Sequence, residues 1–325
     1  MKKNIAILAG GDSSESVISL KSAEQIRLIL DKTKYNTFTI YVKKNEWIIT
    51  SDKYCDTIIN KDDFSFSWDN TKIKFDFALI AIHGTPGEDG KLQSYFEILR
   101  IPYSTSDSLI SALTFNKYAC KAYLDYAGIK SANSVLIRKN DKINTNKIIS
   151  KLGLPCFVKP NSGGSSFGVS KVKTKDDLSP AIKKAFNEDN EIIIESFLNG
   201  TEVSCGIIKT KNKEIIFPIT EIVSENEFFD YEAKYKKGKA KEITPARISK
   251  KAEEATKKLT SKIYDTLNCK GIVRIDYMIN DETPNFIEIN TVPGMSAESI
   301  IPKQAKVYGI SMTEIFTMII EDLIL

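Results

Sequence analysis

The 325-residue sequence contains a single histidine, His83, and no long apolar run. Its longest apolar segment, Phe77 to Ile82, is far shorter than the roughly 20 residues that span a bilayer. Near the N-terminus, the apolar stretch Ile5 to Ala9 stops at Gly10-Gly11-Asp12, which is too short for the apolar region of a signal peptide. We therefore expect a cytoplasmic protein that makes no membrane contact.

Cysteine content and net charge exclude further classes of protein. Five cysteines are scattered along the chain without a C-x-x-C pair, which indicates reduced, structural thiols rather than disulfides or a metal cluster. The 46 Lys and Arg against 42 Asp and Glu leave a formal charge of +4, too weak a bias to indicate a nucleic-acid partner. With one imidazole in the chain, any chemistry must run on carboxylates, lysines, arginine and phosphate.

The first third of the chain alternates strand and helix patterns. Apolar segments at 3–9, 38–42 and 75–82 predict strands, and segments 14–31, 92–99 and 110–126 predict helices. This alternation is typical of a parallel sheet covered by helices, that is, an α/β domain.

The remaining two thirds are closer to an α+β pattern. Segments 155–159 and 169–172 predict strands on either side of a Gly-rich loop, and a helix and a further strand follow at 177–186 and 191–197. We then expect strands at 202–208 and 214–222, a helix at 250–267, two strands and one terminal helix. At roughly 150 residues per domain the length allows two or three domains, which we place at 1–105, 106–194 and 195–325.

Two polar triplets near the C-terminus form the strongest candidate site. Arg274-Ile-Asp276 and Glu288-Ile-Asn290 each place two polar side chains on one face of a strand, because strand side chains alternate. The turn-forming run 280–284 lies midway, so a hairpin would set Asp276 opposite Glu288 and Arg274 opposite Asn290. Two carboxylates and an amide oxygen suit Mg²⁺. The alternative is the charged outer face of an amphipathic strand pair. We favour the metal site because the opposite face would bury the apolar residues Ile275, Tyr277, Ile287 and Ile289.

Lys159 and the loop 161–168 form the second candidate site. Glycines allow main-chain N–H groups to approach phosphate oxygens, and the Lys159 ammonium adds positive charge. Because the lysine precedes the glycines, the segment matches neither of the common nucleotide-binding glycine motifs. A plain hairpin connection is the alternative to a flap that closes over nucleotide.

Three weaker features could belong to the same site. Gly10-Gly11 precedes a helix that contains Glu15, although an acidic residue also stabilises a helix N-terminus by itself. His83 ends a strand, where open α/β sheets bind ligands, or else it is a loop histidine satisfied by the main chain. The segment 230–235 has the aromatic and basic composition of an active-site lid, or of a solvated loop.

Taken in order, these motifs resemble the D-alanine–D-alanine ligases of the ATP-grasp superfamily, from one end of the chain to the other. The matching segments are Gly10-Gly11-x-Ser-x-Glu15, His83 to Gly90, Lys159-Pro with Gly164-Ser-Ser-x-Gly168, Tyr231 to Tyr235, Gly271 to Asp276, and Glu288 to Ser296 with Ser299-Ile300. The resemblance implies a three-lobed ATP-grasp fold with an N-terminal parallel α/β domain. It also implies that two D-alanines are joined for peptidoglycan precursors while ATP yields ADP and phosphate.

The resemblance further implies the cofactors, the partners and the binding residues. ATP would bind with two Mg²⁺, for which Mn²⁺ could substitute, and the chain would form a homodimer. Asp276, Glu288 and Asn290 would hold the metal. The residues implied for ATP are Lys117, Lys159, Ser166 and Lys234 at the phosphates, Glu195, Phe197 and Leu198 around adenine, and Glu202 at the ribose.

For the amino acids, the resemblance implies two adjoining subsites. Glu15 would bind the ammonium of the first D-alanine, with His83 beside it, and Ser165 and Tyr235 would link flap and lid towards Glu15. Gly294, Ser299 and Ile300 would bind the second D-alanine, with Ser299 on its carboxylate. Arg274, together with main-chain N–H groups near Gly294, would stabilise the tetrahedral oxyanion, a role that suits its fixed charge and fork.

Two departures and several alternatives stand beside this interpretation. Glu298 and Ile300 vary from the family pattern around Ser299, although the Ser299 hydroxyl is present. The family usually carries a second acid after Glu15, whereas Val17 stands here, which affects the tuning of the ammonium site. Another ATP-grasp carboxylate–amine ligase should lack Glu15, Tyr235 or Ser299, and a non-catalytic relative should lack a metal ligand or Arg274. All are present, and Lys234-Tyr235 favours a dipeptide over D-alanine–D-lactate. A dinucleotide-binding oxidoreductase is disfavoured because its fingerprint is missing after Gly10-Gly11.

Overall fold

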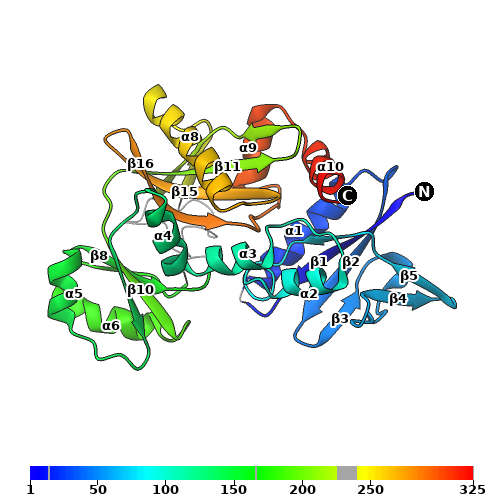
Figure 1. The fold of residues 1–325 in the computed structure, drawn as a ribbon, viewed down its shortest axis with the longest axis horizontal. Coiled ribbons are helices and arrows are strands. Elements are labelled where there is room, and N and C mark those ends of the chain that lie inside the picture. The colour runs from blue at the N-terminus through cyan, green and yellow to red at the C-terminus, as the bar shows by residue number, and fades with distance from the viewer. Residues whose placement is uncertain (14, 165–166, 225–239, 325) are drawn as a thin grey trace.

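The computed structural model describes residues 1–13, 15–164, 167–224 and 240–324, and within these the chain forms three groups of elements, each built around a sheet (Figure 1). Ser165 and Ser166 of the predicted flap, and Lys234 and Tyr235 of the predicted lid, lie outside the described residues. The three-lobed α/β and α+β architecture expected for the chain is confirmed, and it determines which segments meet at the site.

The first group contains a sheet of order β3-β2-β1-β6, in which β1 pairs in parallel with β2 and β6. The short strand β3 is an antiparallel edge that the sequence patterns do not predict. A separate hairpin, β4–β5, packs beside it, and helices α1 and α2 belong to the same group (Figure 1). Its elements are β1 (Lys3–Gly10), α1 (Ser16–Ile29), β2 (Tyr35–Lys43), β3 (Glu46–Ile49), a short 3₁₀ turn (Asp52–Tyr54), β4 (Ser65–Trp68), β5 (Thr71–Lys74), β6 (Phe77–Ile80) and α2 (Lys91–Leu99).

The second group is an antiparallel sheet of order β7-β10-β8-β9, packed on helices α5 and α6. The Gly-rich loop connects β8 to β9, as the sequence predicts. The elements are β7 (Ser134–Arg138), α5 (Thr145–Leu152), β8 (Cys156–Pro160), β9 (Ser170–Val172), α6 (Lys175–Ala185) and β10 (Glu191–Ser196).

The third group is a mainly antiparallel sheet of order β14-β13-β11-β15-β16, with β12 also paired to β11. Helices α4 and α8 pack on one face of it, and α9 and α10 extend from it towards the first group (Figure 1). The elements are β11 (Thr201–Lys209), β12 (Glu214–Ile216), β13 (Thr220–Ser224), β14 (Ala240–Ile243), α8 (Lys250–Thr266), β15 (Ile272–Asn280), β16 (Thr283–Asn290), α9 (Ile300–Tyr308) and α10 (Met312–Leu323).

The prediction of a single helix at 110–126 is wrong. Two helices, α3 (Ser108–Phe115) and α4 (Lys117–Tyr126), meet at Asn116 instead. Asn116 has extended backbone angles, and its side chain caps α4 by accepting from the N–H of Ala119. The main chain of Lys117 donates to the carbonyl of Asn161, and the N–H of Tyr118 donates to the Asn161 side chain. The start of α4 is therefore fixed by the beginning of the Gly-rich loop.

Two further elements are divided where the sequence patterns predict one. The strand expected at 214–222 is split into β12 and β13 by a segment that contains Pro218, which has no N–H to donate to a sheet. The one terminal helix expected is two helices, α9 and α10, because Gly309 ends α9 in the left-handed conformation. Ser311 and Glu314 then begin α10 with a capping box.

A shared core joins the first group to the C-terminal helices. Residues of β1 and α1 pack in one hydrophobic cluster with residues of α9 and α10, including Ile301 and Phe316. Thr313 also donates to the carbonyl of Ile29 at 2.6 Å. In the described part of the chain, no helix has both the length and the apolar character that a membrane span requires.

Ser19 on α1 provides a test of this packing. Its buried hydroxyl accepts from the N–H of Gly10 at 2.9 Å and donates to the carbonyl of Ala81 at 2.7 Å, which joins α1 to the C-terminal ends of β1 and β6. We predict that Ser19→Ala lowers the free energy of unfolding by about 1–3 kcal/mol, because both main-chain groups lose a buried partner. Urea unfolding measures this, with exposed Ser94→Ala on α2 as the control. If Ser19→Ala and Ser94→Ala unfold at the same midpoint urea concentration, the prediction is wrong.

Candidate active site

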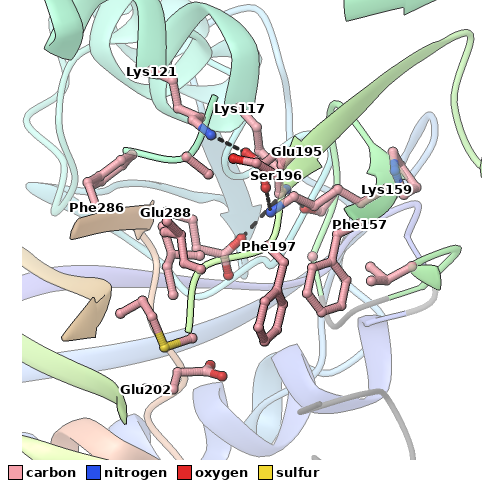
Figure 2. A pocket seen from close by; sticks show the side chains of 18 of the residues that line it. Lys117, Lys121, Phe157, Lys159, Glu195, Ser196, Phe197, Glu202, Phe286 and Glu288 are labelled. Atoms are coloured by element: carbon pink, nitrogen blue, oxygen red, sulfur yellow. Dashed lines mark hydrogen bonds and ion pairs between the residues drawn. The ribbon is translucent and has the colours of Figure 1, made fainter. Parts of the chain in front are cut away.

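A cavity of about 210 Å³ lies where the second and third groups meet (Figure 2). Its lining combines apolar side chains with several lysines and glutamates. The residues that line it are Lys117, Lys121, Ala132, Phe157, Lys159, Pro160, Gly163, Gly164, Phe167, Val169, Glu195, Ser196, Phe197, Leu198, Glu202, Met278, Phe286, Ile287 and Glu288. Every described residue that the sequence analysis assigned to ATP lies in this set.

A flat apolar slot forms one part of the cavity. The rings of Phe157 and Phe197 stack with centroids 6.2 Å apart, and the Lys171 ammonium lies 4.6 Å from the Phe197 ring centre. Phe197 and Leu198 directly follow β10, and Phe157 lies on the adjacent strand β8. Such a slot suits a planar heterocycle, which stacks on aromatic faces.

A buried ion cluster borders the slot. The Glu195 carboxylate, on β10, is paired with the ammonium groups of both Lys121 from α4 and Lys159 from β8 (Figure 2). Burial by itself would raise the pKa of Glu195, but the two lysines outweigh it and hold the pKa below its usual value. Burial likewise opposes protonation of Lys159, yet Glu195 and Glu288 keep its pKa above the ordinary value. Glu195 and Lys159 are therefore both ionised at neutral pH.

Lys117 connects the cavity to the candidate metal site. Its ammonium donates to the carbonyl of Gly163 in the Gly-rich loop at 2.5 Å and lies 3.8 Å from Glu288. The lysine occupies the first turn of α4, whose start is fixed by the same loop. Lys117 and Lys159 thus bring two positive charges beside the glycines, which favours binding of phosphate groups.

The hairpin β15–β16 confirms the predicted register. Asp276 pairs with Glu288 and Arg274 pairs with Asn290, across a turn in which Asp281 and Glu282 both have positive φ. The Arg274 guanidinium donates to both carboxylate oxygens of Asp276, at 2.9 and 2.7 Å, and the amide nitrogen Nδ2 of Asn290 donates to Asp276 at 3.3 Å. The oxygen donors of Asp276, Glu288 and Asn290 therefore lie on one face of the hairpin, a donor set that fits Mg²⁺.

One expectation for this hairpin is wrong. Ile275, Tyr277 and Ile289 are buried in the core as predicted, but Ile287 lines the cavity instead. A register shift between Asp276 and Tyr277 places an additional residue in β16, so side-chain alternation is interrupted at Ile287. The bulge brings Phe286, Ile287 and Glu288 together along the cavity wall.

The predicted ammonium site is assembled from the first group and the flap. Glu15 is buried directly ahead of α1, and a Cβ built on Gly164 would lie only 2.8 Å from its carboxylate, so the flap backbone closely approaches Glu15. Ser13 donates to the carbonyl of His83 at 2.8 Å, which holds the two loops together. Val17, in place of the usual acid, is largely exposed.

His83 is buried and its Nε2 has no hydrogen-bond partner within the described residues. Burial lowers the pKa of His83, while Glu15 and a main-chain hydrogen bond at Val292 act in the opposite direction and Arg274 adds to the lowering. His83 is therefore neutral at pH 7, and it lies among Glu15, Arg274 and the segment after β16.

The residues predicted for a second amino acid meet at the start of α9. Ser299 precedes this helix, and its hydroxyl lies 2.8 Å from that of Ser296. A Cβ on Gly294 would lie 2.9 Å from the Ser299 hydroxyl, so a larger residue at this position would displace that hydroxyl. Ile300 is the first residue of the helix and its side chain is buried, which leaves the main chain to face a ligand. Helix N-termini favour carboxylates.

Sequence analysis missed two residues that support this site. Lys121 lies one helical turn after Lys117, and that i, i+4 spacing on one helix was the available signal. Ser204 on β11 is buried directly across the strand from Asp276 and donates to it at 2.6 Å. No pattern in the sequence relates Ser204 to Asp276, because the pairing arises from sheet topology.

The fold and the site define an ATP-grasp carboxylate–amine ligase. Family models described as "D-ala D-ala ligase N-terminus" and "D-ala D-ala ligase C-terminus" match residues 4–106 and 123–321. The chain therefore belongs to the D-alanine–D-alanine ligase family.

Individual relatives match along almost the whole chain. A D-alanine–D-alanine ligase of Phocaeicola vulgatus is 52% identical over 99% of both sequences. Among solved structures, the VanG D-Ala:D-Ser ligase of Enterococcus faecalis has a TM-score of 0.89 and 32% identity, with full coverage of both chains. The Bacillus anthracis D-alanine–D-alanine ligase complexed with ATP has a TM-score of 0.79 and 31% identity, covering 98% of this chain and 97% of that one.

The single histidine allows a direct test of the electrostatics. We predict that His83 titrates below its ordinary pKa of about 6.5, because burial disfavours the imidazolium. The unfolded chain then binds a proton that the folded chain does not, so folding stability contributed by neutral His83 is lost as the pH falls below about 6.5. The only imidazole Cε1–H signal in the NMR spectrum reports the pKa, and His83→Asn provides the comparison for unfolding. A pKa above 6.5 would contradict the prediction.

Proposed function

We propose that this protein joins two D-alanine molecules in an ATP-dependent reaction that supplies peptidoglycan precursors. The single observation that carries the proposal is that all three groups meet at the Gly-rich loop, where Lys117 contacts Gly163 and lies beside Glu288 of the hairpin, and where Gly164 approaches Glu15. Family membership at about half identity over nearly the full length supports the same reaction.

The first step makes the carboxylate of one D-alanine reactive. A carboxylate oxygen attacks the terminal phosphorus of ATP, the bond to ADP breaks, and an acyl phosphate forms. We assign Lys117 and Lys159 to the phosphates, where fixed positive charges offset the charge of the transferring group. Ser166 and Lys234 are proposed to assist them, as the family resemblance implies.

The second step forms the peptide bond. The amine of the second D-alanine attacks the acyl carbon, the tetrahedral intermediate collapses, and inorganic phosphate leaves as the amine releases a proton. We assign Glu15 to the ammonium of the first D-alanine, beside neutral His83, and Ser299 with Ile300 to the carboxylate of the second. Arg274 and the main chain at Gly294 stabilise the oxyanion. Ser165 and Tyr235 join flap and lid, which keeps water from the acyl phosphate.

Divalent cations fit the hairpin by the chemistry of its donors. We propose that Asp276, Glu288 and Asn290 hold two Mg²⁺, or Mn²⁺, which would neutralise phosphate charge when bound. Arg274, Asn290 and Ser204 contact Asp276, and such second partners orient a metal-binding carboxylate. Glu195, Phe197 and Leu198 are assigned to the adenine, and Glu202 to the ribose.

The proposal also covers the organisation of the chain. We propose domains at 1–105, 106–194 and 195–325, a cytoplasmic location and a homodimer. Each segment contributes a sheet of its own, although β10 crosses the boundary at 194 and α4 packs on the third sheet. Sedimentation velocity tests the dimer.

The choice of acceptor is tested by phosphate release with ATP and Mg²⁺ against a panel of D-amino and hydroxy acids. D-serine belongs in the panel because one structural neighbour is a D-Ala:D-Ser ligase. We expect D-alanine to support the highest kcat/KM and D-lactate to support little turnover. Comparable rates with D-serine would favour a D-alanine–D-serine ligase.

The metal assignment predicts the effect of Glu288→Gln. Removal of one carboxylate charge from the donor set should cost several kcal/mol in the transition state, or about a thousandfold in D-alanine-dependent phosphate release. The Mg²⁺ concentration for half activity should rise as well. Glu282→Gln, at the exposed end of the same hairpin, is the control and should retain activity. Wild-type turnover by a folded Glu288→Gln variant would remove the metal assignment.

A further inference from the structure

One buried carboxylate in the cavity has two lysine partners, which is one more cation than its charge requires. The side chains of Glu195, Lys121 and Lys159 are 8%, 5% and 12% exposed, so water supplies little of their solvation. Removing both cations from an ionised buried carboxylate is strongly unfavourable. At least one of the two lysines must therefore stay paired with Glu195 when a ligand enters the cavity.

Lys121 reaches Glu195 from α4, on the opposite side of the carboxylate from Lys159, and the two ammonium groups pair with different oxygens of Glu195 (Figure 2). It projects from α4 between Cys120 and Leu124, which is packed in the core of the third group. Its only described ion-pair partner is Glu195. Burial and the neighbouring Lys159 lower the pKa of Lys121, while Glu195 opposes them, so its charge depends on that carboxylate.

Lys159 has competing attractions that Lys121 lacks. It lies on β8, one residue before the strand ends at Pro160, and Glu288 and Glu202 act on it as well as Glu195. A triphosphate beside the glycines would add several negative charges on the same side. Its arrival thus draws Lys159 from Glu195 and leaves Lys121 as the remaining counter-ion.

We propose that Lys121 is a positioning residue that keeps Glu195 an ionised, acceptor-only carboxylate while nucleotide is bound, and thereby sets the preference of the site for a 6-aminopurine over a 6-oxopurine. This rests on the proposed function, in which Glu195 faces the base of ATP.

The chemistry of the base explains the selectivity. An ionised carboxylate can only accept hydrogen bonds, so it pairs with the 6-amino group of adenine. A 6-oxopurine presents a carbonyl oxygen at the same position, and two facing acceptors repel each other. A protonated Glu195 could donate to that carbonyl, so loss of Lys121 should reduce the discrimination.

The charged groups around Glu195 come from four elements. Lys121 and Lys117 lie on α4, Lys159 on β8, Glu202 on β11 and Glu288 on β16. On the neighbouring strand β7 its pairing partner is the uncharged Ser134. Lys121 and Lys159 are the two cations paired with Glu195 in the described chain, so their removal acts most directly on its protonation.

The test compares ATP with inosine triphosphate, which carries a carbonyl in place of the 6-amino group. Dissociation constants and kcat/KM are measured for both nucleotides from pH 5.5 to 8.5. In Lys121→Met we expect ATP to bind about tenfold more weakly, with kcat changed less than KM. In the same variant, the ratio of kcat/KM for ATP to kcat/KM for inosine triphosphate should fall about tenfold. The fall should be largest at low pH. Lys121→Arg should retain most of the preference, and exposed Lys147→Met on α5 should change nothing.

Two outcomes would overturn the inference. If Lys121 has only a structural role, Lys121→Met should weaken the binding of ATP and of inosine triphosphate equally. The ratio of their dissociation constants would then be unchanged. The wild-type protein provides a test even when the variant does not fold, because an ionised Glu195 keeps the ratio constant down to pH 5.5. A wild-type ratio that collapses between pH 7 and 5.5 contradicts the proposal. Binding is measured without D-alanine, so a failed ligase assay would reject the proposed function and leave this result interpretable.

Discussion

The site depends on the register of one hairpin. The positive φ values of Asp281 and Glu282 close β15 and β16 with a two-residue turn, and the pairing that follows sets Asp276 opposite Glu288. A slip by one residue would turn these oxygens into the core and bring Ile275 to the cavity. Arg274 and Ser204 hold Asp276 from its own strand and from β11, so the register also organises the charges around it.

The same hairpin fixes positive charge beside the candidate metal site in the absence of ligand. The ammonium of Lys117 donates to the Gly163 carbonyl and lies beside Glu288. This one side chain therefore connects α4 to the Gly-rich loop and to the β15–β16 hairpin. Cations that are already fixed in position stabilise charge without reorganisation when phosphate transfers. The core shared by α1, α9 and α10 then holds the Glu15 side and the Ser299 side of the site in one body.

Sequence reasoning succeeded where the chemistry is local. The triplets at 274–276 and 288–290 alternate with apolar residues, and the turn between them fixes their pairing, so this part was predictable from spacing alone. The boundary at Asn116 was not, because the main chain of α4 is satisfied by Asn161, which lies far along the chain. Ile287 was misplaced for a similar reason, since a bulge leaves no signature in a short apolar run.

The least predictable part of the site is its buried ion cluster. Lys121 and Glu195 are 74 residues apart, and each alone resembles an ordinary surface charge on a helix or a strand end. Burial converts them into a pair whose members depend on one another, since neither charge is well solvated without its partner. Topology decides that one lysine reaches Glu195 from α4 and the other from β8. The protonation state of Glu195 is therefore a property of the assembled fold and not of any segment of the sequence.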